Sequence, residues 1–595
     1  GGPTGPADRS IPLAEPLLPW SRPGDETRPI LTGGTTMSGI IGVMNIGQTG
    51  IEANEAALKT AGHNLSNVNT PGYSRERVML EQHVPDMGHP GMMGAGVDAA
   101  RIRRVVNHFL ENQSTRQKTT LGFWESSRIS LGEIDSYYFH AQSEGLSRDL
   151  SRFFNHWETV ANHPADRAAR ATLITYGHNL GQDFHQMTAL YAESRNRLGH
   201  QIEDQVKKIN ARISRIAVLN HSILAARGRG EDPNTFLDER ARIAGEVSRL
   251  TNAHFFHDKD GSLNLHIGGQ AAFSEQQVGH MAAVFDPVHD RYRITFAPPS
   301  HSGAPIDITD RVKGGVLGGY IDVRDHKIKS MQHHLDLLAF QVANSVNSIH
   351  SGGYGLSGQT GVNFFTPTVE VARTGGDGSG SLVANVEDAS AVLPKILVET
   401  DAAGVRVYGA KDHVLIGSGV VKDGVATVSA GGYSLRVLAP KKGSETYTVS
   451  GGTHVAGTAL HLDVTGLSAD DVAAAGSPAS PGTNEGDNAN AHKIFYLSQK
   501  HLHFPGEDEP ASIYEYYASG VAKIGAWARQ SRLNDKAQVA ISQSLETQRQ
   551  AVSGVSIANE SAKIIRFEKA YQASANLIQM VNRLLDTLVR LPNSG

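Results

Sequence analysis

Apolar residues recur every seven positions at both ends of this chain. The N-terminal series consists of Met44, Ile51, Leu58 and Leu65, with Gly47, Asn54, Ala61 and Val68 interleaved. The C-terminal series consists of Ile564, Tyr571, Ile578 and Leu585, with Phe567, Ser574, Val581 and Leu588 interleaved. Alternating spacings of three and four place such residues on one side of an α-helix. We therefore expect two terminal helices that pack on each other; the alternative is that each packs on its own local domain.

A tight turn is predicted where the N-terminal series ends. Residues 67–73 read Asn-Val-Asn-Thr-Pro-Gly-Tyr. Pro71 fixes its own φ and lacks an N–H, whereas Gly72 accepts a positive φ, and this pair is favoured at the centre of a turn. A short strand is expected from Arg75 to Gln82, followed by a loop over 83–97.

Length and composition exclude several classes of protein. A chain of 595 residues is too long for one hydrophobic core, so three or four domains are expected. Its formal net charge of −5 provides no basic excess to neutralise nucleic acid. The sequence contains no run of eighteen apolar residues, so no membrane-spanning helix is expected. Cysteine is absent, which excludes disulfides, thiolate metal sites and cysteine nucleophiles.

The first 36 residues differ in composition from the rest. Prolines recur without a period among glycines and polar residues, which predicts a disordered extension or a tag. Met37 directly precedes the patterned stretch and is the expected functional start. No basic segment is followed by an apolar run here, so a cleaved signal peptide is not expected.

The order of the remaining patterns predicts an α+β multidomain fold. A terminal helical coiled-coil module is expected over 37–100 and 546–595. A core domain of long helices is expected over 101–367 and 486–545, with a small β meander near 254–325. Helices in this core are expected from Arg101 onward, with boundaries at His163-Pro164 and at Gly228-Arg229-Gly230. Residues 368–485 are rich in Gly, Ser, Thr and Val, and they predict an inserted all-β domain. Strands in that domain are expected at Tyr433–Val437 and Leu460–Val464, where apolar residues alternate.

No pattern predicts catalysis or a bound metal or cofactor. His333 and His334 are adjacent and would point to different sides of a helix, while His501 and His503 lack a third ligand nearby in sequence. Phosphate-binding loops and nucleophile elbows are absent as well. The run 507–509, Glu-Asp-Glu, is interpreted as exposed loop charge, with a calcium site as the alternative. We therefore expect a protein that is not an enzyme.

Two short motifs resemble those of the axial proteins of the bacterial flagellum, which comprise rod, hook and hook-associated proteins. Residues 64–73, Asn-Leu-Ser-Asn-Val-Asn-Thr-Pro-Gly-Tyr, resemble the N-terminal motif, and residues 567–573, Phe-Glu-Lys-Ala-Tyr-Gln-Ala, resemble the C-terminal motif. The long helices, the segment 236–240 and the segment 553–556 resemble the hook–filament junction family in particular. The resemblance covers about 38–350 and 484–591, so the β insert lies outside it. Where that family usually carries an acidic run after Ser556, this chain keeps only Glu560, which is expected to change surface charge but not fold.

The resemblance implies a structural role at the junction between hook and filament. The implied partners are further copies in a ring, hook protein on one side, a second junction protein or flagellin-side proteins on the other, and an export chaperone. The implied location is the extracellular flagellum, reached through the flagellar type III export apparatus. The expected assembly residues are Met44, Ile51, Leu58, Leu65, Asn67, Asn69, Pro71, Gly72, Tyr73, Ile564, Phe567, Tyr571, Ile578, Val581, Leu585 and Leu588. The alternatives are an adhesin or binding protein that acts through the β insert, or another axial protein such as a hook protein.

Overall fold

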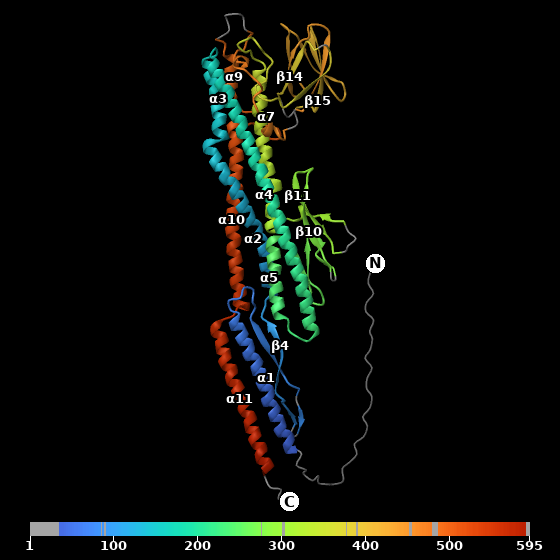
Figure 1. Ribbon diagram of the computed structural model, residues 1–595, viewed down its shortest axis with the longest axis vertical. Coiled ribbons are helices and arrows are strands. Elements are labelled where there is room, and N and C mark those ends of the chain that lie inside the picture. The colour runs from blue at the N-terminus through green and yellow to red at the C-terminus, as the bar shows by residue number, and fades with distance from the viewer. Residues whose placement is uncertain are drawn as a thin grey trace, which may run out of the picture. The chain divides into compact units, whose positions relative to one another are not determined.

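The computed structural model describes residues 35–84, 86–88, 91–274, 277–299, 304–376, 378–387, 391–451, 455–478 and 486–590 (Figure 1). The predicted extension over 1–36 lies outside these residues, except for Thr35 and Thr36, which begin the first helix. The chain forms two compact units. Of the described residues, those within 35–66, 76–103 and 556–590 belong to unit 1, and those within 67–75 and 104–555 belong to unit 2.

Unit 1 consists mainly of two long helices from opposite ends of the chain. Helix α1 (Thr35–Ser66) and helix α11 (Ile557–Arg590) pack side by side (Figure 1). They are antiparallel, because Gly47 faces Ile578 whereas Asn64 bonds to Glu560. Strands β1 (Glu76–Gln82) and β4 (Val97–Arg104) form a two-stranded sheet, and β2 (Asp86–Gly88) pairs with β3 (Gly91–Met93).

Unit 2 is built on long helices. They are α2 (His108–Glu144), α3 (Leu146–Asn162), α4 (Arg167–Gly228), α5 (Asn234–Leu250), α6 (Gly315–Asp322), α7 (Lys329–His350), α9 (Ala489–Leu497) and α10 (Ile513–Ser553). A π-helical segment, Val323–Ile328, joins α6 to α7. Helix α10 packs along α2, and α4 packs on α3 and α5. Asn107 caps α2, Asp166 caps α4 and Ser512 caps α10, in each case by accepting hydrogen bonds from backbone N–H groups.

Small sheets lie between α5 and α6 in the sequence. Strands β5 (His254–His257), β6 (Leu263–Ile267) and β7 (Gln270–Ala271) form one sheet, and β8 (Phe273–Ser274) pairs with β9 (Gln277–Val278). Strands β10 (His280–Asp286), β11 (Arg291–Ala297) and β12 (Ile306–Asp307) form another sheet. Both three-stranded sheets bury apolar side chains in the core that α4 and α5 share, for example Leu265 and Phe296.

Two antiparallel sheets follow α7. One has the strand order β13 (Glu370–Gly375), β20 (Ser444–Ser450), β15 (Lys395–Asp401), β16 (Gly404–Gly409), β17 (Leu415–Val420). The other has the order β14 (Ser381–Val386), β19 (Tyr433–Leu438), β18 (Val425–Ala430). Side chains of both sheets share one apolar core, which Phe340 of α7 joins. A mixed helix-and-sheet fold is therefore confirmed.

The predicted strand over Leu460–Val464 is wrong. Residues Thr458–His461 form a short helix, α8, and Leu460 is exposed whereas Leu462 is buried. The carboxylate of Asp336 on α7 accepts hydrogen bonds of 3.0 Å from the N–H groups of Gly457 and Ala459. A carboxylate at this position favours the start of a helix, and this tertiary contact overrides the alternating pattern.

Two other boundaries also differ from the sequence expectation. The predicted loop over 83–97 contains the β2–β3 hairpin, whose backbone pairing needs no alternation of side chains. The helical region expected from Arg101 begins only at His108, because Arg101–Arg104 complete strand β4. The predicted helix boundaries at His163-Pro164 and at Gly228-Arg229-Gly230 are confirmed.

A buried histidine joins the end of α7 to two loops. His350 donates from Nδ1 to the carbonyl oxygen of Val362 at 2.7 Å and accepts at Nε2 from the N–H of Ala473 at 2.9 Å. The ring is therefore neutral, because a backbone N–H requires an unprotonated Nε2. Burial lowers the pKa of His350 to about 4, although the bond to Val362 opposes that change.

His350 predicts an acid-sensitive core. Its pKa rises from about 4 to its ordinary 6.5 on unfolding, so the unfolded state binds the extra proton within this window. Its contribution to stability is complete above pH 6.5 and falls by about 3 kcal/mol as the pH drops to 4. Urea unfolding at pH 7 and pH 4 should therefore show a smaller loss of stability for His350→Gln than for the unchanged chain.

The matched control is His333→Gln, since His333 is exposed on the same helix. This control should keep the full acid-induced loss. Burial raises the pKa of Asp183 to about 6, so the contribution of Asp183 to stability changes with pH in the opposite direction to that of His350. Asp183 is present in every variant, so only differences between variants report on His350. Equal acid losses for His350→Gln and His333→Gln would contradict the assignment.

Candidate functional site: the terminal helix pair and the turn that follows it

Helix α1 packs on α11 through its smallest side chains. Gly47, Gly50 and Asn64 contact α11, and the other buried residues of α1 are also small, namely Ala53, Ala57, Thr60 and Ala61. A Cβ added at Gly47 would lie 2.7 Å from Cγ1 of Ile578, and one added at Gly50 would lie 2.8 Å from Oγ of Ser574. These distances leave no room for a side chain. The glycines therefore set how closely the two backbones approach.

The predicted stripe of α1 lies beside this small-residue face. Ile51, Leu58 and Leu65 are half-buried, and Met44 is 36% exposed. On α11, Val581 is buried, Tyr571 is 38% exposed, and Ile564, Phe567, Ile578 and Leu585 are half-buried. The side chain of Leu588 lies outside the described residues. The structure thus brings both predicted stripes into one unit.

A buried polar cluster fixes the register of the helix pair. Asn64 accepts from the N–H of Glu76 at 2.8 Å, and its amide donates to the Glu76 carbonyl at 2.9 Å and to Oε2 of Glu560 at 3.1 Å. Lys563 forms an ion pair with Glu560 at 2.6 Å. Glu560 is only 1% exposed, whereas Ala558 and Asn559, where the acidic run is missing, are exposed. Glu560, the one acid that remains, is therefore a buried residue and not part of the surface charge.

The predicted Pro-Gly turn is confirmed. The N–H of Tyr73 donates to the carbonyl of Thr70 at 3.2 Å, and Gly72 has a φ of +84°. Glycine is needed there because other residues rarely adopt this conformation. The turn belongs to unit 2, so Asn67, Asn69, Pro71, Gly72 and Tyr73 are grouped apart from the apolar stripes.

One carboxylate anchors the chain just after the turn. Asp238 of α5 accepts from the backbone N–H of Ser74 at 2.9 Å and forms an ion pair with Arg104 at 2.6 Å. The next residue, Arg75, donates its N–H to Ser553 and accepts from the N–H of Val105, both at 2.8 Å. Segments from three parts of the sequence are thus tied together within unit 2.

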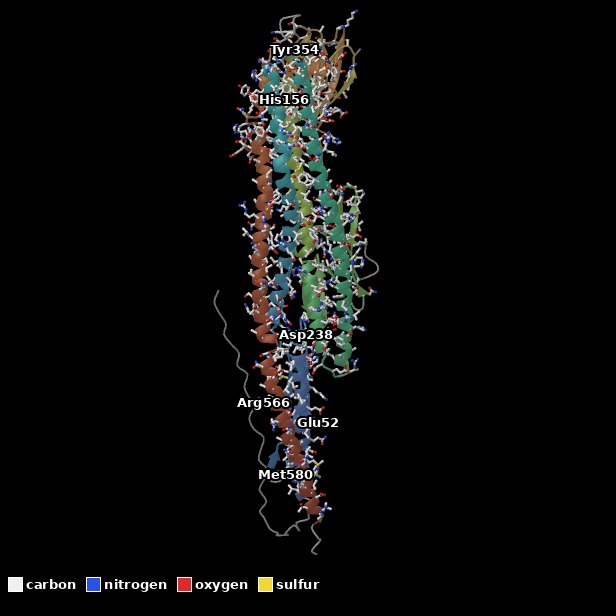
Figure 2. All side chains as sticks on the ribbon, turned by 60° about the vertical axis from the view of Figure 1, so that its left-hand side comes forward. Glu52, His156, Asp238, Tyr354, Arg566 and Met580 are labelled. Carbon is white, nitrogen blue, oxygen red and sulfur yellow. The ribbon has the colours of Figure 1, made fainter. Side chains whose placement is uncertain are left out.

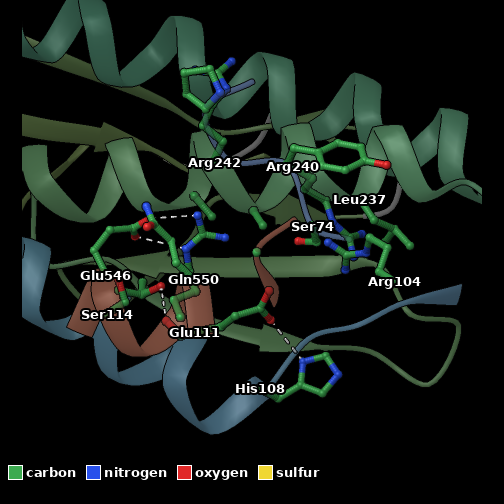
Figure 3. Close-up of a pocket in the computed structure, with 18 of the residues that line it drawn as sticks. Ser74, Arg104, His108, Glu111, Ser114, Leu237, Arg240, Arg242, Glu546 and Gln550 are labelled. Atoms are coloured by element: carbon green, nitrogen blue, oxygen red, sulfur yellow. Dashed lines mark hydrogen bonds and ion pairs between the residues drawn. The ribbon is translucent and has the colours of Figure 1, made fainter. Parts of the chain in front are cut away.

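The turn forms one wall of a cavity of about 1080 Å³. Figure 3 shows Ser74, Arg104 and Arg240 on one side of it and Glu111, Glu546 and Gln550 on the other. The lining comes from the turn, α2, α5, β5 and the last turns of α10, together with Gly554 and Val555. All of these residues belong to unit 2.

Some of the cations in this cavity have carboxylate partners and others do not. Arg104 pairs with Asp238, Arg242 pairs with Glu246, and Arg549 pairs with Glu546 at 2.9 Å. Among the described residues, no carboxylate lies within ion-pair distance of Lys118 or Arg240. Arg240 is buried and donates instead to Asn220 at 2.8 Å and to the carbonyl of Gly261 at 3.1 Å.

The electrostatic environment opposes further positive charge in this cavity. Burial lowers the pKa of Lys118. Burial also lowers the pKa of Arg240 to about 10, and the neighbouring Arg104 adds to this effect. The pKa of His257 is lowered by burial first and then by the charge of Arg240.

The sequence patterns did not indicate that Asn64 and Glu560 join the terminal helices, that Asp238 anchors the chain after the turn, or that Lys118 lines the cavity. Asn64 lies on the face that carries Gly50, Ala57 and Ala61, and the three- and four-residue spacing of these small residues was a usable signal. Asp238 lies in the segment 236–240 that resembles the family, but nothing in that segment indicates its partners, which lie 134 and 164 residues away in sequence. Within the described part of the chain, no three potential metal ligands gather, and no helix is both long and apolar enough to cross a membrane.

Comparison with known proteins supports the resemblance of the motifs. Residues 131–365 match the flagellar hook-associated protein FlgK helical domain. Residues 44–73 match a flagella basal body rod protein family, and residues 546–591 match the C-terminal region of the flagellar basal body rod FlgEFG proteins. Flagellar hook-associated protein 1 of Escherichia coli (strain K12) is 25% identical over 558 residues, which cover 92% of this chain and 99% of that protein. The chain belongs to the FlgK family.

More distant members of the family agree with this assignment. Flagellar hook-associated protein 1 of Bacillus subtilis (strain 168) is 22% identical, over 91% of this chain and 96% of that protein. The solved structure of the flagellar hook junction protein FlgK from Burkholderia pseudomallei has a TM-score of 0.55 and 18% identity, and it covers 74% of this chain and all of the other. The fold is therefore shared. The relatives described above are structural proteins of the flagellum by name, and none of them is named as an enzyme.

The Asp238 anchor predicts a large loss of stability when its charge is removed. Asp238→Asn leaves the guanidinium of Arg104, whose side chain is only 11% exposed, without its carboxylate, and breaking a buried pair costs about 3–5 kcal/mol. Chemical unfolding of the full chain, followed by circular dichroism, should show this loss.

The matched control is Asp470→Asn, which breaks an exposed bidentate pair with Arg167. Exposed pairs contribute about 0–1 kcal/mol, so this variant should remain close to the unchanged chain. A similar loss of stability in both variants would show that Asp238 does not act as a buried anchor.

Proposed function

We propose that this chain forms the junction between hook and filament in a bacterial flagellum, where copies assemble through their terminal helices. The proposal is carried by membership of the FlgK family together with the pairing of α1 and α11. The Burkholderia pseudomallei relative is itself named as a hook junction protein.

Unit 1 exposes more apolar surface than a helix pair with no further partner needs. Its exposed large apolar side chains are Ile41, Met44, Met79, Leu80, Val84, Ile557, Ile565, Tyr571, Met580, Leu584 and Val589. Met580 is marked on α11 in Figure 2 and is 61% exposed. Exposed apolar surface that is contiguous typically marks a protein–protein interface. Coiled-coil packing between neighbouring terminal helices would bury these side chains and stabilise them by about 1.5–3 kcal/mol each.

The parts of the chain have separate roles in this proposal. The terminal helical domain, with Met44, Ile51, Leu58, Leu65 and the α11 stripe, provides the assembly interface. The long-helix core over 101–367 and 486–545 provides a rigid body. The inserted all-β domain over 368–485 projects from that core. The turn residues 67–73 connect the assembly helices to the core.

The proposed partners follow from the same role. Copies form a ring, with hook protein on one side and a second junction protein or flagellin-side proteins on the other. The chain reaches the outside of the cell through the flagellar type III export apparatus, attended by a chaperone. An adhesin that acts through the β insert is not favoured, because relatives named as hook-associated proteins match more than nine-tenths of the chain.

The exposed face of α11 should be essential for assembly. Leu584 is 51% exposed, so Leu584→Asp leaves the α1–α11 contact intact but places a charge where a neighbouring helix would bury it. Binding of the purified chain to isolated hooks should fall at least about tenfold, since one buried apolar side chain contributes more than 1.4 kcal/mol. Sedimentation and electron microscopy would measure this binding.

The matched control is Asn576→Asp, which adds the same charge at an exposed polar position of α11. This variant should bind hooks as the unchanged chain does, and both variants should keep the same circular dichroism spectrum. Undiminished binding by Leu584→Asp would remove this face of α11 from the assembly interface.

A further inference from the structure

The cavity beside the Asn67–Tyr73 turn has two cations that form no direct ion pair within the described part of the chain. The carboxylates of Asp238, Glu246 and Glu546 are already engaged by Arg104, Arg242 and Arg549. Within the described residues, Lys118 and Arg240 form no direct ion pair, and the carboxylates that act on them, Glu546 and Glu246 for Lys118 and Asp260 for Arg240, do so from farther away. Partly desolvated positive charges that lack a directly paired carboxylate are costly, and the cost falls when an anion enters.

Lys118 is held in place by packing. A Cβ added at Gly245 of α5 would lie 2.5 Å from Nζ of Lys118, so the ammonium group lies directly against the α5 backbone. This contact between α2 and α5 positions the charge without using one of its hydrogen bonds. Burial is the first cause of the lowered pKa values of Lys118, Arg240 and His257, and nearby carboxylates only partly offset it.

The remaining lining indicates what kind of anion would fit. Phe255, Phe256, Leu237 and Val555 provide apolar walls, and Phe256 is exposed. A small inorganic ion would leave these walls uncovered. A volume of about 1080 Å³ lies at the upper end of the range for ligand pockets and accommodates several residues of a peptide. Guanidinium and ammonium groups beside apolar walls suit carboxylate side chains on an extended segment.

We propose that this cavity receives a carboxylate-bearing segment of a neighbouring protein subunit, with Lys118 and Arg240 as its cationic contacts. The inference rests on the proposed junction role, because it names what an adjoining subunit presents to this one. It also gives the Pro-Gly turn a second role. The turn that ends the assembly helix is one wall of the receptor, so the position of the turn and the shape of the cavity change together.

The chain itself provides an acidic probe. Residues Glu507, Asp508 and Glu509 are exposed between two prolines, just before α10 begins. The cavity lies at the other end of this 41-residue helix, about 60 Å away at 1.5 Å per residue. The acidic segment of one copy therefore cannot fill its own cavity, and a synthetic peptide of residues 504–511 meets no internal competitor.

The test is binding of this labelled peptide to the full chain at low ionic strength, by fluorescence anisotropy. The control peptide carries Gln, Asn and Gln in place of the three acids. We expect the acidic peptide to bind, the amide peptide to bind at least tenfold more weakly, and added salt to weaken binding. Lys118→Gln should weaken binding at least tenfold. Lys422→Gln, which removes an exposed lysine from the β insert, should leave binding unchanged.

His257 reports on the cavity without any substitution. A carboxylate placed near Arg240 offsets the positive charge, so NMR should show the His257 pKa rising when the acidic peptide binds. The proposal is overturned by absence of peptide binding, by equal binding to Lys118→Gln, or by phosphate alone producing the whole His257 shift. Peptide binding is measured without hooks, so its failure leaves the junction role standing. Failure of the unchanged chain to bind hooks would remove the junction role without altering the peptide result.

Discussion

The carboxylate of Asp238 meets both a backbone amide and a guanidinium where the chain passes between its two units. The chain passes between these units four times, at residues 66–67, 75–76, 103–104 and 555–556. On the unit 2 side, Ser74, Arg75, Arg104 and Ser553 are held by Asp238 or by one another. A buried ion pair of this kind adds little net stability but strongly penalises any arrangement that separates its members. It therefore acts mainly as a constraint on geometry.

The cavity depends on the same constraint. The Asn67–Tyr73 turn, the start of α2 and the end of α10 are brought together by these few bonds, and the space between them is lined by their side chains. Because the turn carries a glycine with positive φ and a proline with fixed φ, its shape has little freedom. The position of Lys118 relative to the turn is thus set by backbone contacts, which leaves a defined site for an incoming carboxylate.

Local patterns predicted much of the fold. The helix boundaries at Pro164 and Gly228 and the Pro-Gly turn depend on backbone preferences of single residues, and all three are confirmed. The strand predicted over Leu460–Val464 is wrong because Asp336, more than 120 residues away in sequence, caps a helix there. The heptad stripes were visible, but the buried face of α1 is made of Gly and Ala, whose importance depends on how near α11 comes. The roles of Lys118 and Asp238 could not be predicted, because they come from partners that only the folded chain supplies.

The contact between Asn64 and Glu560 joins residues that are 496 positions apart in the sequence. The loop that it closes is almost the whole chain, so its entropic cost must be met by contacts formed earlier within unit 2. Neither α1 nor α11 can complete this pairing until synthesis has reached the last forty residues. A chain that stops before α11 lacks the partner of Gly47 and Gly50 on α1. The helix pair of unit 1 can therefore form only after both α1 and α11 have been synthesised.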